Sequence, residues 1–431
     1  MKGLIGMVKP CDLATPITHV ADQISHCTTA RTTHHRTRHL RVKSSWNSES
    51  GQTRVANRVA NLDQKWREYQ GIKNWEGLLD PLDDGLRHEI LRYGDFVEAA
   101  YRSFEFDTSS PEYGNCKFDE STMLDGCGLG GSGYKVTKSL HATCGVPLPG
   151  WTDRMPRWTS ANSSWIGYVA VCNDEKEIAR LGRRDVVIAY RGTATCLEWI
   201  ENLRATLTAL PNDVAPDRKR AKVQKGFLSM YTSATTTCPS LRDMVREEIS
   251  RIIETYGDEP LSVTITGHSL GAALATLTAY DITSTFKHSP MVTVVSFGGP
   301  RVGNRNFRSQ LENSRTRVLR IVNSTDLITK VPGFLVDGSN EMTKGRAGLQ
   351  RWLRERVDET DWFKYADVGK ELRLCSDASP YLTKTDIATC HDLKTYLHLV
   401  DGYVSSSCPF RTTAKRLLSG VKHEKQQILV R

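Results

Sequence analysis

A five-residue stretch, GHSLG at Gly267–Gly271, lies between a run typical of a strand and a run typical of a helix. The residues before it, Leu261–Thr266, are apolar and β-branched, and those after it, Ala272–Ile282, are mostly good helix formers. A serine on a sharp strand-to-helix turn needs glycine two residues away on both sides, because a Cβ there would clash with the neighbouring strand or helix. The pattern therefore predicts a nucleophile elbow at Ser269, rather than an ordinary glycine-bounded turn.

A serine hydroxyl is a weak nucleophile and needs a histidine base and a carboxylate that orients this base. After an elbow of this kind the two partners follow in the order Asp, His. Asp326 comes just after the strand-like Thr316–Asn323, where open α/β sheets gather ligands, so we expect it to be the acid. Asp281 in the helix after the elbow, and Asp337 and Asp367 in loop-like sequence, are weaker alternatives and are expected to be solvated or capping residues.

Two histidines, His391 and His398, follow Asp326 within the expected folded region. His391 opens the segment CHDLKTYLHLVDGY, where a loop side chain can reach the strand ends, whereas His398 lies in the middle of a helical pattern. We therefore expect His391 to be the base and His398 to be a packed or partly exposed helix residue. His268 is expected to be a structural neighbour of the nucleophile.

Acyl transfer also needs two hydrogen-bond donors for the oxyanion that develops on the reacting carbonyl. The elbow supplies the backbone N–H of Leu270. A second donor is expected after an earlier strand, and the strand-like DVVIAY at Asp185–Tyr190 runs into Arg191-Gly192-Thr193. Together with the candidate nucleophile, acid and base, this makes Thr193 the expected second donor.

Several motifs, in this order, resemble one known family; they are YRGTATCLEWIENL, KGFLSMYTS, GHSLGAALATLTAYDI, FGGPRVGN, RIVNSTDLITKVPG, YADVGKELRL and CHDLKTYLHLVDGY. They are similar to the class 3 (fungal-type) lipases and, within these, to the class I plant phospholipase A1 branch. The upstream KWREYQGIKNWEGLLDPLD, HEILRYGDFVEAAYRSFEFD and GSGYKVTKSLHAT resemble the same branch, so the resemblance covers about Leu62–Pro409. It implies an α/β-hydrolase fold and carries the family's nucleophile, acid, base and oxyanion residue to Ser269, Asp326, His391 and Thr193.

By this resemblance the protein is a serine acylhydrolase that releases fatty acid from the sn-1 ester of a plastid glycerolipid and needs no metal or organic cofactor. The head group stays open among phospholipid, galactolipid and triacylglycerol. A soluble carboxylesterase or an acyltransferase would share the same triad. A non-enzymatic, lipase-like protein would lack part of it, whereas here all three members have candidates.

Strand-like and helical runs alternate after Trp165, which predicts a mostly parallel sheet with helices on both faces. The expected strands are WIGYVAVC, DVVIAYRG, LSVTITG, MVTVVSFGG, TRVLRIVN and ELRLC, and the expected helices are Cys196–Leu210, Leu241–Tyr256, Ala272–Phe286 and Asn304–Asn313. Leu62–Phe106 is expected to be helical, with Trp66, Leu86, Ile90, Phe96 and Ala100 on packing faces. A G-x-G-x-x-G match at Gly128–Gly133 is followed by the strand-like YKVTKS instead of a helix, so we reject a dinucleotide site.

Apolar residues recur at helical spacing directly after the expected oxyanion strand; they are Leu197, Trp199, Ile200, Leu203, Leu207 and Leu210. Such a stripe usually packs permanently on the core. Its position, however, matches the lid of fungal-type lipases, and a lid must be apolar beneath and able to swing. We therefore predict an amphipathic lid helix at Cys196–Leu210, with the charged Pro211–Lys225 as its mobile return.

The net charge of +9 comes from the two ends of the chain. Residues 1–58 hold 9 Lys and Arg against 3 Asp and Glu, residues 411–431 hold 6 against 1, and the body holds 43 against 45. A nucleic-acid-binding body would carry the basic excess on its folded surface, so we expect no nucleic-acid partner. We expect three parts: a disordered transit peptide at 1–55, a class 3 lipase domain at 56–410 and a basic C-terminal tail at 411–431.

The N-terminal segment is rich in Ser, Thr, His and Arg, poor in acid, and lacks the apolar region of a secretory signal. A metal site in its His-rich TTHHRTRH is a weaker interpretation than a disordered basic presequence. Composition alone leaves chloroplast and mitochondrion open; the Ser and Thr content and the resemblance favour the chloroplast, in the stroma, at the thylakoid surface or on a plastoglobule. Eleven cysteines without regular spacing suit a reducing compartment. No run of eighteen apolar residues occurs, so we expect peripheral contact with a membrane or lipid droplet.

Overall fold

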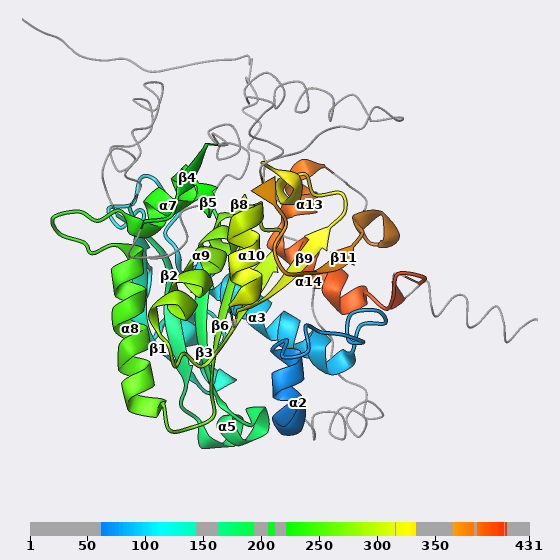
Figure 1. Cartoon of the computed structure of the whole chain (residues 1–431), viewed down its shortest axis with the longest axis horizontal. Helices are drawn as coiled ribbons and strands as arrows, with labels where there is room; N and C mark the ends of the chain where they lie inside the picture. The colour runs from blue at the N-terminus through cyan, green and yellow to red at the C-terminus, as the bar shows by residue number, and fades with distance from the viewer. Residues whose placement is uncertain are drawn as a thin grey trace, which may run out of the picture. The chain divides into compact units, whose positions relative to one another are not determined.

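Seven strands form one central sheet, in the order β1-β2-β3-β6-β7-β9-β11 (Figure 1). The computed structural model describes residues 62–143, 163–193, 206–211, 221–314, 316–332, 365–382, 386–408 and 410–411. The strands are β1 (Tyr134–Ala142), β2 (Ser164–Cys172), β3 (Arg184–Tyr190), β6 (Leu261–His268), β7 (Met291–Phe297), β9 (Arg317–Asn323) and β11 (Lys370–Leu374). The last five of these pair in parallel, while β1 and β2 pair antiparallel at one edge. The predicted mostly parallel sheet is therefore confirmed.

Side chains on the two faces of the sheet pack into two different cores. On β3, Val186, Ile188 and Tyr190 belong to one core, and Val187 and Ala189 belong to the other. This alternation follows from the two-residue period of a strand. The first core is completed by α7 (Lys225–Thr232), α8 (Leu241–Tyr256), α9 (Leu270–Thr285) and α10 (Arg305–Asn313), of which α9 and α10 lie in front of the sheet in Figure 1. The second core is completed by α2 (Leu62–Tyr69), α3 (Asp84–Ser103), α4 (Met123–Gly126) and α14 (Leu393–Gly402).

The N-terminal region Leu62–Phe106, which was expected to be helical, contains two helices separated by a non-helical segment. Helix α2 ends at Tyr69, and α3 begins only at Asp84. Between them Gly71 and Gly77 have positive φ angles of 85° and 73°, which a helix does not allow. Asp83 then caps α3 by accepting hydrogen bonds from the backbone N–H groups of the first turn. The five predicted packing residues of these helices are all buried.

A smaller antiparallel sheet, in the order β10-β8-β5-β4, corrects part of the predicted lid helix. Its strands are β4 (Leu207–Ala209), β5 (Lys222–Gln224), β8 (Gly303–Asn304) and β10 (Tyr365–Ala366). Leu207, expected on the lid helix, lies in β4 and pairs with Gln224, which was expected in a mobile loop. Backbone pairing with β5 therefore overrides the helical spacing here. Residues 196–205, which form the first part of the predicted lid helix, lie outside the described residues.

Short helices connect the remaining strands. Helix α5 (Glu175–Leu181) joins β2 to β3, and α13 (Ile387–His391) precedes α14. The described residues also include the 3-10 turns η1 (Gly130–Ser132), η4 (Ile328–Lys330) and η5 (Ser376–Ala378). In Figure 1, α13 lies at the same end of the molecule as β4, β5 and β8, so this end gathers segments that are far apart in the sequence.

Candidate active site

Ser269 lies on a strained turn between β6 and α9. Its φ of 56° and ψ of −123° are rare for a residue with a side chain, and such strain is typical of functional sites. A Cβ on Gly267 would lie 2.4 Å from the backbone of Gly271, and a Cβ on Gly271 would lie 2.5 Å from the carbonyl oxygen of Arg191. Both glycines are thus needed where α9 passes close to β6 and to the end of β3. The local pattern has produced the expected elbow.

Asp326 and His391 meet in a buried hydrogen bond. Asp326 follows the carboxyl end of β9, and His391 is the last residue of α13. The Nδ1 atom of His391 lies 2.7 Å from Oδ2 of Asp326. The other carboxylate oxygen of Asp326 accepts the backbone N–H of Ile328 at 2.9 Å. A carboxylate held in this way keeps the imidazole in one orientation, in which its Nε2 forms no hydrogen bond within the described part of the protein.

The alternative acids and base form other contacts. Asp281 is completely buried and bonds Arg246 Nη2 at 2.5 Å and the Tyr231 hydroxyl at 2.9 Å, so the expectation that it is solvated or capping is wrong. Asp367 bonds Arg301 at 3.0 Å. Asp337 lies outside the described residues. His398 is half-buried in α14 with its Nε2 atom 3.0 Å from the hydroxyl of Ser379, as expected of a packed helix residue.

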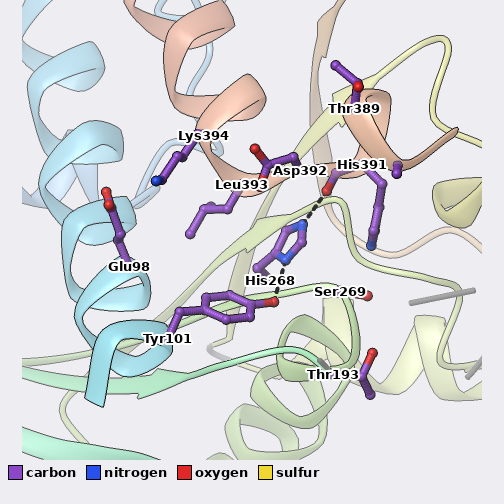
Figure 2. A pocket seen from close by; sticks show the side chains of 11 residues that line it. Glu98, Tyr101, Thr193, His268, Ser269, Thr389, His391, Asp392, Leu393 and Lys394 are labelled. Atoms are coloured by element: carbon purple, nitrogen blue, oxygen red, sulfur yellow. Dashed lines mark hydrogen bonds between the residues drawn. The ribbon is translucent and has the colours of Figure 1, made fainter. Parts of the chain in front are cut away.

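Three buried polar atoms without a hydrogen-bond partner meet at one cavity: Ser269 Oγ, His391 Nε2 and Thr193 Oγ1. The cavity has a volume of about 540 Å³. It is lined by Glu98, Tyr101, Thr193, His268, Ser269, Ala388, Thr389, His391, Asp392, Leu393 and Lys394. Figure 2 shows Thr193, Ser269 and His391 grouped on one side and Glu98 and Lys394 on the other. Buried polar atoms are nearly always hydrogen-bonded, so three exceptions at one cavity indicate a place where another molecule supplies the partners.

Both expected oxyanion donors border the elbow. Leu270 is the first residue of α9, so its N–H has no acceptor within the helix. Thr193 follows the end of β3 and directs its side chain into the cavity. The helix N-terminus adds a partial positive charge at the same place.

His268 is held between two partners, one of which the sequence did not reveal. The Tyr101 hydroxyl lies 2.7 Å from its Nδ1, and its Nε2 lies 2.7 Å from the carbonyl oxygen of His391 (Figure 2). Because a carbonyl only accepts, Nε2 carries the hydrogen and Nδ1 accepts from Tyr101. Burial, reinforced by the nearby His391, lowers the pKa of His268 well below its ordinary value. His268 is therefore a neutral bridge that fixes the backbone of His391, and its expected structural role agrees with this geometry.

Tyr396 is a second residue that the sequence did not indicate. Its buried hydroxyl donates to Oδ2 of Asp326 at 2.6 Å and accepts the backbone N–H of Asn323 at 3.2 Å. Burial, and next the Asp326 carboxylate, raise the pKa of this hydroxyl, so it remains a donor. Its position in CHDLKTYLHLVDGY, five residues after His391, is the signal that could have found it.

None of the predicted lid residues is among the described residues that line this cavity. Leu197, Trp199, Ile200 and Leu203 lie outside them, and Leu207 lies in β4. Within the described part of the chain, no group of three or more His, Cys, Asp or Glu side chains is arranged to hold a metal ion. No helix in that part is both long and apolar enough to cross a membrane.

The lipase (class 3) family model matches residues 187–336, which include the elbow and Asp326. The chain is 62% identical over 364 residues to the chloroplastic phospholipase A(1) DAD1 of Arabidopsis thaliana, covering 83% of this chain and 80% of that protein. It is 39% identical over 353 residues to the chloroplastic galactolipase DONGLE of the same plant, covering 79% and 70%. A solved lipase of Rhizomucor miehei with its propeptide matches at 17% identity and a TM-score of 0.43, covering 74% of this chain and 78% of that chain.

Identity of this extent to a phospholipase A1, over most of both proteins, shows the family. The central sheet carries the strained serine between β6 and α9, and His391 of the buried aspartate–histidine pair lines the same cavity as this serine. The chain belongs to the class 3 lipases, carboxylic ester hydrolases with an α/β-hydrolase fold, and within them to the plant phospholipase A1 branch.

Proposed function

We propose that this protein hydrolyses the sn-1 ester of glycerolipids through Ser269, His391 and Asp326. The observation that carries the proposal is the meeting of three unpartnered buried atoms, Ser269 Oγ, His391 Nε2 and Thr193 Oγ1, at one cavity. A nucleophile, a base and an oxyanion donor are the groups that must remain available to a reacting ester.

The reaction begins when Ser269 Oγ attacks the ester carbonyl carbon and passes its proton to His391 Nε2. Asp326 holds Nδ1–H of His391 and stabilises the imidazolium. The carbonyl oxygen becomes an oxyanion that accepts from the Leu270 N–H and from Thr193. The C–O bond to glycerol then breaks, and the departing oxygen takes the proton from His391. Water attacks the acyl-enzyme by the same steps and releases the fatty acid.

The names of the relatives support the choice of substrate class. One is a phospholipase A1 and another is a galactolipase, and phospholipids and galactolipids both carry an acyl chain on the sn-1 oxygen. The apolar residues Leu197, Trp199, Ile200 and Leu203, which follow Thr193, support a substrate with long acyl chains at a membrane or lipid-droplet surface. The enzyme binds that surface peripherally. The substrate is a phospholipid, a galactolipid or a triacylglycerol, which differ in the group on the sn-3 oxygen.

The site of action is the chloroplast. Two relatives are named chloroplastic, and the first fifty or so residues are basic and acid-poor as in a transit peptide. A chain that begins at Arg54 is therefore expected to be as stable and as active as the full chain. Unfolding of this shortened chain, or a cytosolic location for a fluorescent fusion of residues 1–55, would show that the segment is not a transit peptide.

Product analysis tests the substrate class directly. The protein beginning at Arg54 is incubated with mixed thylakoid lipids whose sn-1 and sn-2 acyl chains differ. We expect release of the sn-1 acid and accumulation of the matching 2-acyl lipid, with Ser269→Ala as the inactive control. Release of the sn-2 acid, or turnover of soluble short-chain esters alone, would contradict the proposal.

A further inference from the structure

A buried arginine without a carboxylate partner lies beside the expected oxyanion donor. Arg191 is 6% exposed and directly follows β3, two residues before Thr193. Its Nε donates to the carbonyl of Trp165 at 3.0 Å, its Nη1 to the carbonyl of Gly192 at 2.8 Å, and its Nη2 to the hydroxyl of Ser164 at 3.2 Å. Among the described residues no carboxylate forms an ion pair with it. Burying a charge without an opposite charge costs free energy, so the position of Arg191 calls for an explanation.

Arg184, at the other end of the same strand, provides a comparison. Its guanidinium also donates to a backbone carbonyl, that of Cys172 at 2.8 Å, and lies 4.4 Å from the ring centre of Tyr256. It differs by pairing with Glu259 at 2.7 Å. The guanidinium of Arg191 is covered instead by the ring of Phe104 at 3.5 Å. Burial lowers the pKa of Arg191 to about 10, so the group keeps its charge at neutral pH, and no carboxylate in the described part of the chain pairs with it.

The hydrogen bond from Arg191 sets the direction of one peptide group. In a trans peptide the C=O and the N–H point in opposite directions. Because the Gly192 carbonyl points toward Arg191, the Thr193 N–H of the same peptide points away from it. A Cβ on Gly192 would lie 3.1 Å from Cβ of Ser269 and 2.9 Å from the carbonyl oxygen of His268, so this peptide packs against the elbow. The Thr193 hydroxyl, next to this N–H, faces the cavity.

We infer that Arg191 is the positioning residue of the oxyanion site. Its planar fork joins the Trp165 carbonyl of β2 to the Gly192 carbonyl and thereby holds the Gly192–Thr193 peptide with its N–H directed toward the reacting oxygen. The charge also polarises this peptide, which strengthens the N–H as a donor. This inference rests on the proposed hydrolysis at Ser269, and it explains why the charge is buried here without a counter-ion.

Arg191→Met, which removes the fork and the charge while keeping an apolar stem, tests the inference on a soluble p-nitrophenyl ester. Loss of one oxyanion donor commonly lowers kcat by about 100- to 1000-fold, so a misdirected donor should lower it by about 10- to 100-fold with KM unchanged. An alkylboronic acid provides the second measurement. Its boron bonds to Ser269 Oγ, the serine proton passes to His391, and the product is a tetrahedral anion. Its affinity should fall by the same factor as kcat.

Arg184→Met is the matched control, because it removes a similarly placed guanidinium at the far end of β3. It should lower the melting temperature and leave kcat and boronate affinity within twofold of the parent. Arg191→Lys covers the case in which Arg191→Met does not fold. A lysine keeps the charge but lacks the rigid planar fork that fixes both carbonyls, so kcat should fall by about threefold or more.

A folded Arg191→Met protein with unchanged kcat and boronate affinity would overturn the inference. So would an Arg191→Lys protein equal to the parent in both measurements, or a parallel loss of affinity for an uncharged apolar ligand. The soluble ester keeps this result separate from the proposed function. A parent enzyme that cleaves the p-nitrophenyl ester but spares glycerolipids refutes the lipid substrate and leaves the test of Arg191 intact.

Discussion

The Ser269 cavity lies beyond the carboxyl end of β3, whereas the polar cluster around Asp185 lies at the amino end of this strand, and both bury polar side chains. Asp185 is completely buried and accepts from the hydroxyls of Tyr134 at 2.8 Å and Tyr93 at 3.1 Å, from Arg92 at 3.1 Å and from Ser262 at 2.8 Å. We define the Asp185 cluster as Gln70, Glu89, Arg92, Tyr93, Tyr134, Arg183, Asp185, Ser262 and Thr264. None of its buried side-chain atoms is without a partner, whereas three at the cavity are.

This difference separates a structural group from a reactive one. A buried polar network stabilises a fold only if its members satisfy one another. A catalytic group must instead leave one atom available for substrate, and the protein tolerates the resulting cost. The same kind of substitution should therefore lower the stability of the fold in the cluster and lower the activity at the cavity.

The largest effect is expected for Ser269→Ala, with Ser262→Ala as its matched control in the cluster. Ser269→Ala should lower kcat by about 10⁴-fold or more and leave the melting temperature unchanged, since its Oγ has no partner to lose. Ser262→Ala should cost about 1 to 3 kcal/mol of stability, because Ser262 joins Arg183 to Asp185, and should keep the activity of the folded fraction. Thermal unfolding and fatty-acid release measure both. Near-normal release by Ser269→Ala would break the comparison.

His391→Ala should cause a loss of kcat similar to that of Ser269→Ala, because the members of such a triad act as a unit. His398→Ala is the control, because the Nε2 atom of His398 lies 3.0 Å from the Ser379 hydroxyl and its ring packs against Tyr381 and Phe410. It should keep kcat within a few-fold of the parent. The reverse ranking in the same ester assay would show that His398 is the base.

Asp185→Asn should strongly destabilise the protein without changing its chemistry. Removing one partner of a buried ion pair typically costs about 3 to 5 kcal/mol, and Arg92 and Arg183 would both lose this carboxylate. Urea unfolding gives the free energy, and kcat per folded molecule should stay within twofold. A loss of kcat in the folded protein, with little loss of stability, would mean that the cluster acts on the active site.

The two regions should also lose stability in different pH ranges. Burial alone would raise the pKa of Glu89, but Arg92 and Arg183 outweigh burial and lower it to about 2. This carboxylate therefore stabilises the fold above its ordinary pKa of 4.5, and the stabilisation is lost as the pH falls toward 2. The pKa of His268 is lowered from 6.5, so its contribution is lost as the pH falls below 6.5.

Unfolding free energy measured between pH 8 and pH 3 tests this order. The Glu89→Gln protein should no longer lose stability between about pH 4.5 and pH 3, and should keep the loss below pH 6.5 that His268 causes. An unchanged acid profile in Glu89→Gln would show that the Arg92 and Arg183 pairs do not contribute to the pH dependence.

The smallest effect is expected from the apolar stripe after Thr193. If it is a lid, Trp199→Ser and Leu203→Ser should weaken activity on vesicles several-fold more than activity on a soluble short-chain ester. A stripe packed permanently in the core would instead lower stability, and activity on both substrates, by the same factor, because a polar defect in a core costs several kcal/mol. Melting temperature and the two activities, measured on the same variants, distinguish these cases.

The elbow, the Asp326–His391 pair and the parallel sheet were predictable from the sequence. The elbow is marked by five consecutive residues, so a local pattern is enough to recognise it, although Gly271 is also needed for the approach to Arg191 at the end of β3. Asp326 and His391 are far apart in the chain, but each is marked by its place after a strand or before a helix. The alternation of strands and helices supplies the rest, because each run is long enough to show its own period.

The partners of these residues could not be predicted in the same way. Tyr101, Tyr396 and Arg191 are ordinary residues in their own segments, and only the folded chain brings them to His268, Asp326 and the Gly192 carbonyl. The same holds for Asp185, which the sequence shows only as the start of a strand.

Leu207–Ala209 shows the same limit on secondary structure. Its spacing continues a helical stripe, yet it forms β4 because Lys222–Gln224 lies beside it to complete a pair of strands. Three residues are too few to show a period, so the pairing partner decides their conformation. The sequence alone thus indicated the candidate nucleophile, acid and base and their order along the chain. Tertiary structure decided which other side chains hold these residues in place and which of their atoms stay without a partner. The physical reason is that hydrogen bonds and burial depend on neighbours from distant parts of the chain, which a local pattern does not show.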